Sequence, residues 1–315
     1  MKWDLKLIYA STRPWPFRIT YATLAFAAAY ALYSTGTFEP IQLLLLGMTF
    51  VGVLVLHIMV NWLNDYFDYY IGTDTRTSGS VIYRVHPIYN GVFKPHELLM
   101  VSLFLGVIAV AVGLAVALLF NRPLVLLFGF IGLFLALFYN APPFGLKYRA
   151  LGEVATFLGF FFMFIGAFYV MTGFVTWEAV VLAVIPGLLT ASVLASNNVR
   201  DIEEDSRAGF ATLAALLGRR NFALVVMIMV AMSYLSVVAM VALGKLPLVA
   251  LLSFITFPAA VKIIRDIYSE HVALKSEKEA EDAPVRVSLM EVRFMTVITI
   301  ALLAAYLIDL PFGIA

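Results

Sequence analysis

Nine mainly apolar stretches alternate with polar connections along the chain. A helix that crosses ~30 Å of hydrocarbon needs about 20 apolar residues, and most of the stretches approach that length. Their apolar residues run continuously rather than in strict alternation, which excludes the strands of an outer-membrane barrel. The pattern therefore predicts nine transmembrane helices, within residues 20–34, 41–62, 98–120, 124–139, 154–173, 177–196, 222–243, 246–264 and 296–308.

The composition agrees with a membrane protein that has no sizeable soluble part. Apolar residues make up 63% of the 315 positions and charged residues only 13%. We therefore expect an all-α integral membrane protein with one transmembrane domain over residues 1–315. The net charge of +1 indicates no nucleic-acid partner, and a chain without cysteine has neither disulfides nor thiolate metal ligands.

Basic residues fall almost entirely on one side when successive connections are assigned to alternate sides of the membrane. Of the 21 basic residues, only Arg122 and Lys245 lie opposite the N-terminus. The positive-inside rule then predicts a cytoplasmic N-terminus and cytoplasmic long connections, in an integral cell-membrane protein. Within the fifth predicted helix, Gly152, Gly159, Gly166 and Gly173 recur every seven residues. This stripe predicts close packing of that helix against a neighbour.

Polar residues form a stripe where the second predicted helix approaches the cytoplasm. Spacings of four, three and four residues place four of them on one helix face: His57, Asn61, Asn64 and Asp68. Asp65 lies beside this stripe, and Asp74 follows it. The sixth predicted helix ends in a similar pattern, Asn197, Asp201 and Asp205, which also share a face. Because each cluster follows an even-numbered span, we expect two related halves, about 1–145 and 146–315.

These carboxylates lie at helix C-terminal ends, where the helix dipole already disfavours anions. Solvated loop ends are one interpretation. Magnesium binding is favoured, because Mg²⁺ takes carboxylate oxygens and substrate phosphates as ligands. The predicted metal ligands are Asn64, Asp65, Asp68, Asn197, Asp201 and Asp205.

Metal-binding carboxylates of this kind commonly serve a polyphosphate, which needs further cations. The cytoplasmic side supplies Arg76, Arg84, Lys94, Lys147, Arg149, Arg200 and Arg207, which either set the topology or together bind phosphate. We expect the diphosphate to contact Asn64, Asn197, Arg76, Arg84, Lys94 and Arg207. Neither a Walker A loop nor a Gly-x-Gly-x-x-Gly motif is present, so the phosphate is not bound as in a nucleotide site.

At these motifs the chain resembles the UbiA superfamily of intramembrane aromatic prenyltransferases. Asn197, Asp201 and Asp205 match the family's NxxxDxxxD pattern. Asn64, Asp65 and Asp68 match its NDxxDxxxD pattern, while Gly72 stands at the last position and Asp74 follows two residues later. That ending resembles the branch that prenylates 1,4-dihydroxy-2-naphthoate, and it leaves open whether Asp74 is a ligand. TRPWPFRIT, with Arg13 and Pro14, and YNAPPFGLKYRALGE, with Tyr139 and Lys147, resemble the family's first-helix entry and a substrate-facing loop.

The resemblance implies Mg²⁺-dependent transfer of a polyprenyl group from an isoprenyl diphosphate, such as geranylgeranyl diphosphate, to an aromatic acceptor. The resemblance assigns catalytic roles to Asp68, Asp201, Tyr139 and Lys147, on the cytoplasmic side of the bilayer. Aromatic residues such as Phe67, Tyr139 and Phe161 are expected to shield an allylic carbocation.

Three other functions remain as alternatives. An archaeal-type geranylgeranylglyceryl phosphate geranylgeranyltransferase is the second choice within the family. A CDP-alcohol phosphotransferase is disfavoured, because its DxxDGxxAR signature is absent. A polytopic transporter would need acidic residues in mid-span, and here they lie at helix ends.

Overall fold

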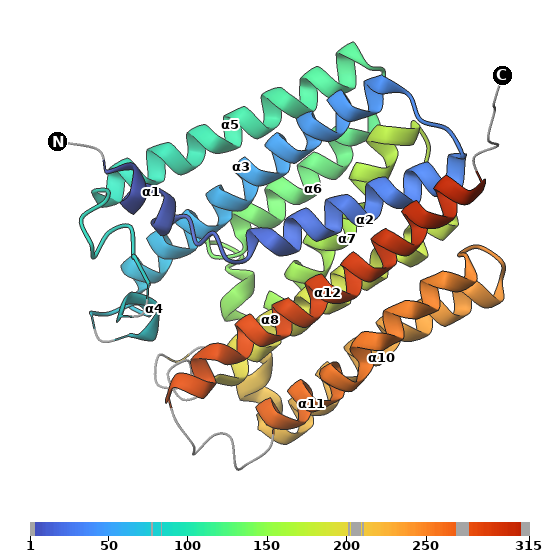
Figure 1. Cartoon of the computed structure of the whole chain (residues 1–315). Helices are drawn as coiled ribbons and strands as arrows, with labels where there is room; N and C mark the ends of the chain where they lie inside the picture. Colours follow the sequence, from blue (N-terminus) through green and yellow to red (C-terminus); the bar gives the residue numbers. More distant parts are fainter. Residues whose placement is uncertain are drawn as a thin grey trace.

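The computed structural model of the protein describes residues 4–76, 78–82, 84–200, 202, 209, 211–268 and 277–309. Within these ranges every element beyond an isolated bridge between Arg149 and Ala211 is helical, and most helices run along one common direction (Figure 1). The first part of the chain contains α1 (Leu5–Ser11), α2 (Phe17–Thr35), α3 (Pro40–Ile71), α4 (Gly79–Ile82), α5 (Pro95–Leu119) and α6 (Leu124–Phe138).

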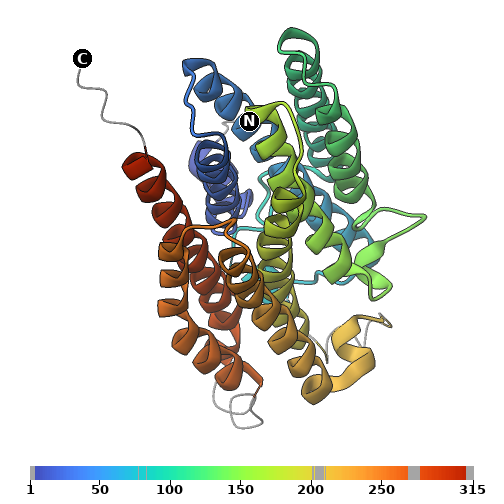
Figure 2. The same ribbon diagram turned by 90° about the vertical axis from the view of Figure 1, so that its right-hand side faces the viewer.

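The second part begins with a short 3₁₀ turn, η1 (Leu146–Tyr148). It continues through α7 (Gly152–Thr172), α8 (Trp177–Arg200), α10 (Leu213–Ala242), η2 (Leu248–Thr256), α11 (Phe257–Tyr268) and α12 (Glu277–Asp309). The two parts interlock, since α2 packs against α7 and α12 while α3 packs chiefly against α5. Figure 2 shows the helices as one bundle in the perpendicular view.

Seven of the described helical segments are long and apolar enough to cross a membrane. They are Pro40–Ile71, Pro95–Leu119, Gly152–Thr172, Trp177–Val199, Leu213–Ala242, Leu248–Arg265 and Val285–Ile308. The other two expected spans are also helical, as α2 and as the 15-residue α6. The all-helical membrane architecture is therefore confirmed, whereas the count of nine spans stays a prediction.

The surface of α5 illustrates how these helices meet lipid. Met100, Phe104 and Val107 are each more than 60% exposed and lie on one helix face. An exposed apolar stripe of this kind disfavours water and suits hydrocarbon. The bundle therefore has an outward apolar face.

The centre of the second part is formed by α7 and α8, which pack closely at Gly187. A Cβ atom there would lie 2.7 Å from the Phe157 ring, so only glycine allows this approach. Two glycines of the expected stripe on α7 lie at ordinary contact distance from neighbouring helices, since a Cβ at Gly152 would be 3.4 Å from Leu194 and one at Gly166 would be 3.6 Å from Phe128. Gly159 has nothing within 4 Å, and Gly173 has φ +85° and ends the helix. The close contact thus uses a glycine of the partner helix.

Candidate active site

The C-terminal end of α3 reaches the same end of the bundle as α1, α4 and the connection between α6 and α7 (Figure 1). This connection folds back on itself, since the Lys147 backbone N–H donates to the Tyr139 carbonyl at 2.9 Å. The eight-residue separation of Tyr139 and Lys147 is thereby closed into one compact loop. That loop brings its polar side chains onto the first acidic motif.

Asp68 is the centre of the resulting network. It is buried, and four side chains donate hydrogen bonds to its carboxylate. Lys147 Nζ lies 2.7 Å from Oδ2, and Asn64 Nδ2 lies 2.9 Å from the same oxygen. Tyr148 Oη lies 2.6 Å and Thr73 Oγ1 3.1 Å from Oδ1. Four donors on two carboxylate oxygens hold the Asp68 side chain in a fixed orientation.

Asn64 lies one helical turn before Asp68 and shares its partners. The Asn64 Oδ1 atom accepts from Asn140 Nδ2 at 3.0 Å and from Lys147 Nζ at 3.3 Å. Asn140 also donates to Tyr148 Oη at 3.0 Å. The predicted stripe is therefore present, with two oxygen-bearing side chains facing one lysine.

Asp65 points to another side of α3, because adjacent residues of a helix are rotated by about 100°. Its fully buried carboxylate pairs with two arginines. Arg84 approaches it through two nitrogens at 2.7 and 3.1 Å, and Arg13 approaches it from the segment before α2. Asp65 therefore anchors the chain's N-terminal segment and the loop after α4 to the first motif.

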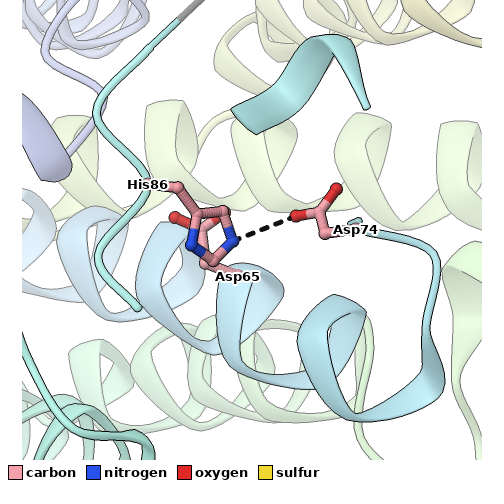
Figure 3. A group of neighbouring side chains, drawn as sticks. All are labelled: Asp65, Asp74 and His86. Atoms are coloured by element: carbon pink, nitrogen blue, oxygen red, sulfur yellow. Dashed lines mark hydrogen bonds and ion pairs between the residues drawn. The ribbon is translucent and has the colours of Figure 1, made fainter. Parts of the chain in front are cut away.

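Asp74 lies beyond the end of α3, where His86 holds it (Figure 3). The His86 Nδ1 atom accepts from the backbone N–H groups of Ile88 and Tyr89, so Nε2 carries the proton and donates to Asp74 Oδ2 at 3.2 Å. Asp65, Asp74 and His86 offer potential ligand atoms within 4.8 Å of one another. Protein donors already engage all three.

The departure from the family pattern at Gly72 has a conformational cause. Gly72 ends α3 with φ +87°, a value that residues with a side chain rarely adopt. The chain therefore leaves the helix at the position where the family pattern has its last aspartate. Asp74 follows in the turn, where its backbone N–H donates to the Asp68 carbonyl at 3.1 Å.

The other predicted site residues lie in different places, and some of them are not described by the structure. Arg76 lies over the Tyr89 ring, with Cζ 5.6 Å from the ring centre. Lys94 is exposed at the start of α5, where its backbone N–H bonds to Glu97. Asn197 is half-buried near the end of α8, while Asp201, Asp205 and Arg207 lie outside the described residues. The metal-ligand and diphosphate assignments therefore stay predictions.

Sequence reasoning missed Asn140, Tyr148 and His86 as members of the site, although Asn140 and Tyr148 adjoin Tyr139 and Lys147 in the quoted stretch. Their signal is tertiary, because each bonds to a residue of or just beyond α3. Burial and the nearby charge of Asp68 raise the pKa of Tyr148, so its hydroxyl remains a donor. Burial, and then the nearby Arg13, lower the pKa of Arg84.

Fold and site together define an integral membrane protein whose buried carboxylates and cations meet at one end of a helical bundle. Residues 22–278 match the UbiA prenyltransferase family. The chain belongs to this family and is a prenyltransferase, as its motifs indicated.

Two relatives and two solved structures give the scale of the similarity. The 1,4-dihydroxy-2-naphthoate octaprenyltransferase of Bacillus subtilis is 25% identical over 265 residues, which are 82% of this chain and 81% of the relative. UbiA prenyltransferase domain-containing protein 1 of Gallus gallus is 31% identical over 229 residues, covering 71% of this chain and 65% of the relative.

A digeranylgeranylglyceryl phosphate synthase structure has a TM-score of 0.65 at 16% identity and covers 95% of this chain and 99% of that one. A UbiA homologue from Archaeoglobus fulgidus bound to DMAPP and Mg²⁺ has a TM-score of 0.61 at 16% identity, covering 92% and 98%. Both structures share the fold of this chain.

Proposed function

We propose that the protein transfers a polyprenyl group from an isoprenyl diphosphate to an aromatic, hydroxyl-bearing acceptor in a Mg²⁺-dependent reaction. The observation that carries this proposal is Asp68, a buried carboxylate aligned with Asn64 and faced by Lys147. Oxygen ligands beside a lysine ammonium suit a metal–diphosphate substrate.

The residues of the first motif fit Mg²⁺. Asn64 and Asp68 offer an amide and a carboxylate oxygen from successive turns of one helix, and Mg²⁺ accepts such ligands together with phosphate oxygens. Asn197, Asp201 and Asp205 are the proposed ligands of the second motif. When bound, the metal supplies positive charge to the departing diphosphate. The Archaeoglobus homologue bound to DMAPP and Mg²⁺ supports this assignment.

Arg13, Arg84 and Lys147 are the proposed diphosphate-binding cations, with further charge from Arg76, Lys94 and Arg207. In the described structure the first three pair with the aspartates of the first motif. Diphosphate is a stronger anion than a carboxylate and accepts several donors at once. We therefore infer that these cations turn from Asp65 and Asp68 toward the diphosphate, which frees carboxylate oxygens for the metal.

The transfer breaks the allylic C–O bond, and diphosphate leaves with the electron pair. An electron-rich carbon of the acceptor then forms the new bond to the prenyl group. Aromatic faces attract cations, so Phe67, Tyr139 and Phe161 are proposed to shield the allylic carbocation from water. The prenyl tail extends between helices toward the bilayer, and the reacting end lies on the cytoplasmic side.

A 1,4-dihydroxy-2-naphthoate type of acceptor is the proposed substrate, with menaquinone biosynthesis as its setting. The Bacillus relative, named for that acceptor, and the ending of the first motif support it. Geranylgeranylglyceryl phosphate is the alternative acceptor, favoured by the structural likeness to a digeranylgeranylglyceryl phosphate synthase. A glycerol phosphate needs a stronger anion site, and the α6–α7 loop contains only two basic residues, Lys147 and Arg149.

The test offers both acceptors to the purified protein in lipid nanodiscs with geranylgeranyl diphosphate, and identifies products by mass spectrometry. We expect prenylated naphthoate, dependent on Mg²⁺ and abolished by EDTA. Asp68→Asn should remove activity. Glu178→Gln should retain it, because Glu178 lies in the first turn of α8, at the end away from Asn197. Exclusive formation of the glycerol ether would refute the proposed naphthoate acceptor. Mg²⁺-independent transfer would refute the proposed metal site.

A further inference from the structure

Glu153 is a buried carboxylate that the proposed mechanism has not used. It lies in the first turn of α7, directly after the loop that carries Tyr139 and Lys147. The residue is only 2% exposed. The Oε1 atom accepts a hydrogen bond from Asn198 Nδ2 at 2.7 Å. The Oε2 atom is fully buried and has no hydrogen-bond partner among the described residues.

A purely structural role explains the Oε1 atom of Glu153 but leaves the Oε2 atom unexplained. Glutamine would accept the Asn198 hydrogen bond equally well and would bury no charge. Leaving a carboxylate oxygen buried without a partner is unfavourable, even where the N-terminus of α7 lessens the cost of the charge. Such an orphaned acceptor indicates a group that arrives from elsewhere.

Glu153 lies between the segments that carry the first and the second acidic motif. Its neighbour Gly152 approaches the loop so closely that a Cβ there would stand 3.7 Å from both the Tyr139 hydroxyl oxygen and Lys147 Cα. On the other side, Asn198 directly follows the motif residue Asn197. Glu153 therefore joins the α6–α7 loop to the end of α8.

Glu153 also differs from the other site carboxylates in its partners. Asp68 accepts four hydrogen bonds, one from Lys147, and Asp65 pairs with two arginines. In the described part of the chain, no basic side chain pairs with Glu153. A carboxylate without a cationic partner is the stronger base.

We propose that Glu153 is the general base for the acceptor hydroxyl, an inference that rests on the proposed function. After diphosphate has left with the electron pair of the C–O bond, the hydroxyl proton moves to Oε2 as the acceptor carbon attacks the allylic carbocation. The acceptor now holds a carbonyl and a tetrahedral carbon. That carbon loses a proton to solvent, or carbon dioxide where it bears a carboxylate. Glu153 then returns its proton to the acceptor oxygen, which restores the hydroxyl and the ring.

The experiment compares wild type with Glu153→Gln, which preserves the acceptor for Asn198 and removes the base. Both are assayed in nanodiscs with geranylgeranyl diphosphate and a series of naphthols whose hydroxyl pKa is lowered stepwise by fluorine. We expect kcat to fall by about 10²-fold or more with the parent acceptor. KM for the prenyl diphosphate should not change. The loss should shrink as the acceptor becomes more acidic, because an ionised hydroxyl needs no base.

Two further variants separate chemistry from folding. Glu153→Asp keeps a carboxylate and should retain more activity than the glutamine variant, even where both are less stable. Glu178→Gln, a matched change in the first turn of α8, should leave kcat unchanged. Equal losses for all acceptors, or full activity of Glu153→Gln, would overturn the inference and leave prenyl transfer intact. If wild type transfers no prenyl group to any acceptor, the proposed function itself fails.

Discussion

Replacing Lys147 by methionine should strengthen Mg²⁺ binding in the absence of substrate while it weakens catalysis. The Lys147 ammonium lies 2.7 Å from Asp68 Oδ2 and 3.3 Å from Asn64 Oδ1, so it occupies the oxygens proposed to bind the metal. Methionine keeps much of the side-chain length and removes the charge. Lys147 is proposed both to compete with the metal for these oxygens and to bind the leaving diphosphate. Losing the first role should raise Mg²⁺ affinity, and losing the second should lower turnover.

The magnitude follows from the geometry. The interaction that Mg²⁺ must displace is the one between the Lys147 ammonium and the Asp68 carboxylate. Two unit charges about 4 Å apart attract each other by about 4 kcal/mol at an effective dielectric constant near 20. The Lys147 side chain is 24% exposed, so solvent screening reduces this effect. If a third of it remains, about 1.4 kcal/mol, the Kd for Mg²⁺ falls roughly tenfold. Turnover should fall by about 10²-fold, because a cation on the leaving group is lost.

The assay titrates Mg²⁺ into purified protein in nanodiscs and follows the rise in Tm, with turnover measured in parallel. Lys245→Met is the matched control, since Lys245 pairs with Glu178 at 2.9 Å in the connection after α10. It should change neither Mg²⁺ affinity nor turnover. A folded Lys147→Met protein that binds Mg²⁺ no more tightly than wild type would refute the competition between lysine and metal.

Three further variants test individual contacts. Tyr148→Phe removes the donor 2.6 Å from Asp68, so the concentration of prenyl diphosphate giving half-maximal rate should rise several-fold in steady-state assays; an unchanged value contradicts its role in orienting Asp68. Gly72→Ala should lower the free energy of unfolding by about 1 kcal/mol, because φ is +87° and no neighbour lies within 4 Å; an unchanged Tm in detergent argues against this conformation. Asp65→Asn should destabilise the protein by about 2–3 kcal/mol, since two arginines lose their charged partner, and equilibrium unfolding in denaturant that matches wild type would contradict the pairing.

The spacing of residues along one helix predicted the first motif well only where its contacts are local. Asn64 and Asp68 lie four residues apart, and the structure joins them at 2.9 Å. Asp65 adjoins the stripe in sequence, but its partner Arg13 is 52 residues away. Helix geometry determines which residues share a face, and it says nothing about which distant segment packs there.

The glycine pattern shows the same limit at the level of packing. A seven-residue repeat on α7 suggested a close helix contact, yet the tight approach uses Gly187 of α8. Whether a small residue is needed depends on the side chain opposite, here Phe157, which a single sequence does not identify. The apolar stretches, in contrast, located the helices, because hydrophobic length is a property of each segment alone.

The charges of the site change the argument for a metal. Carboxylates at the C-terminal end of α3 need positive charge nearby, and the structure supplies it from Arg13, Arg84 and Lys147. Asp65, Asp68 and Asp74 are thus balanced without any metal. In the proposed mechanism, diphosphate alters this balance, because it draws the cations away and leaves the carboxylates unpaired. Mg²⁺ and the prenyl diphosphate should therefore bind cooperatively, each increasing the affinity for the other by the same factor.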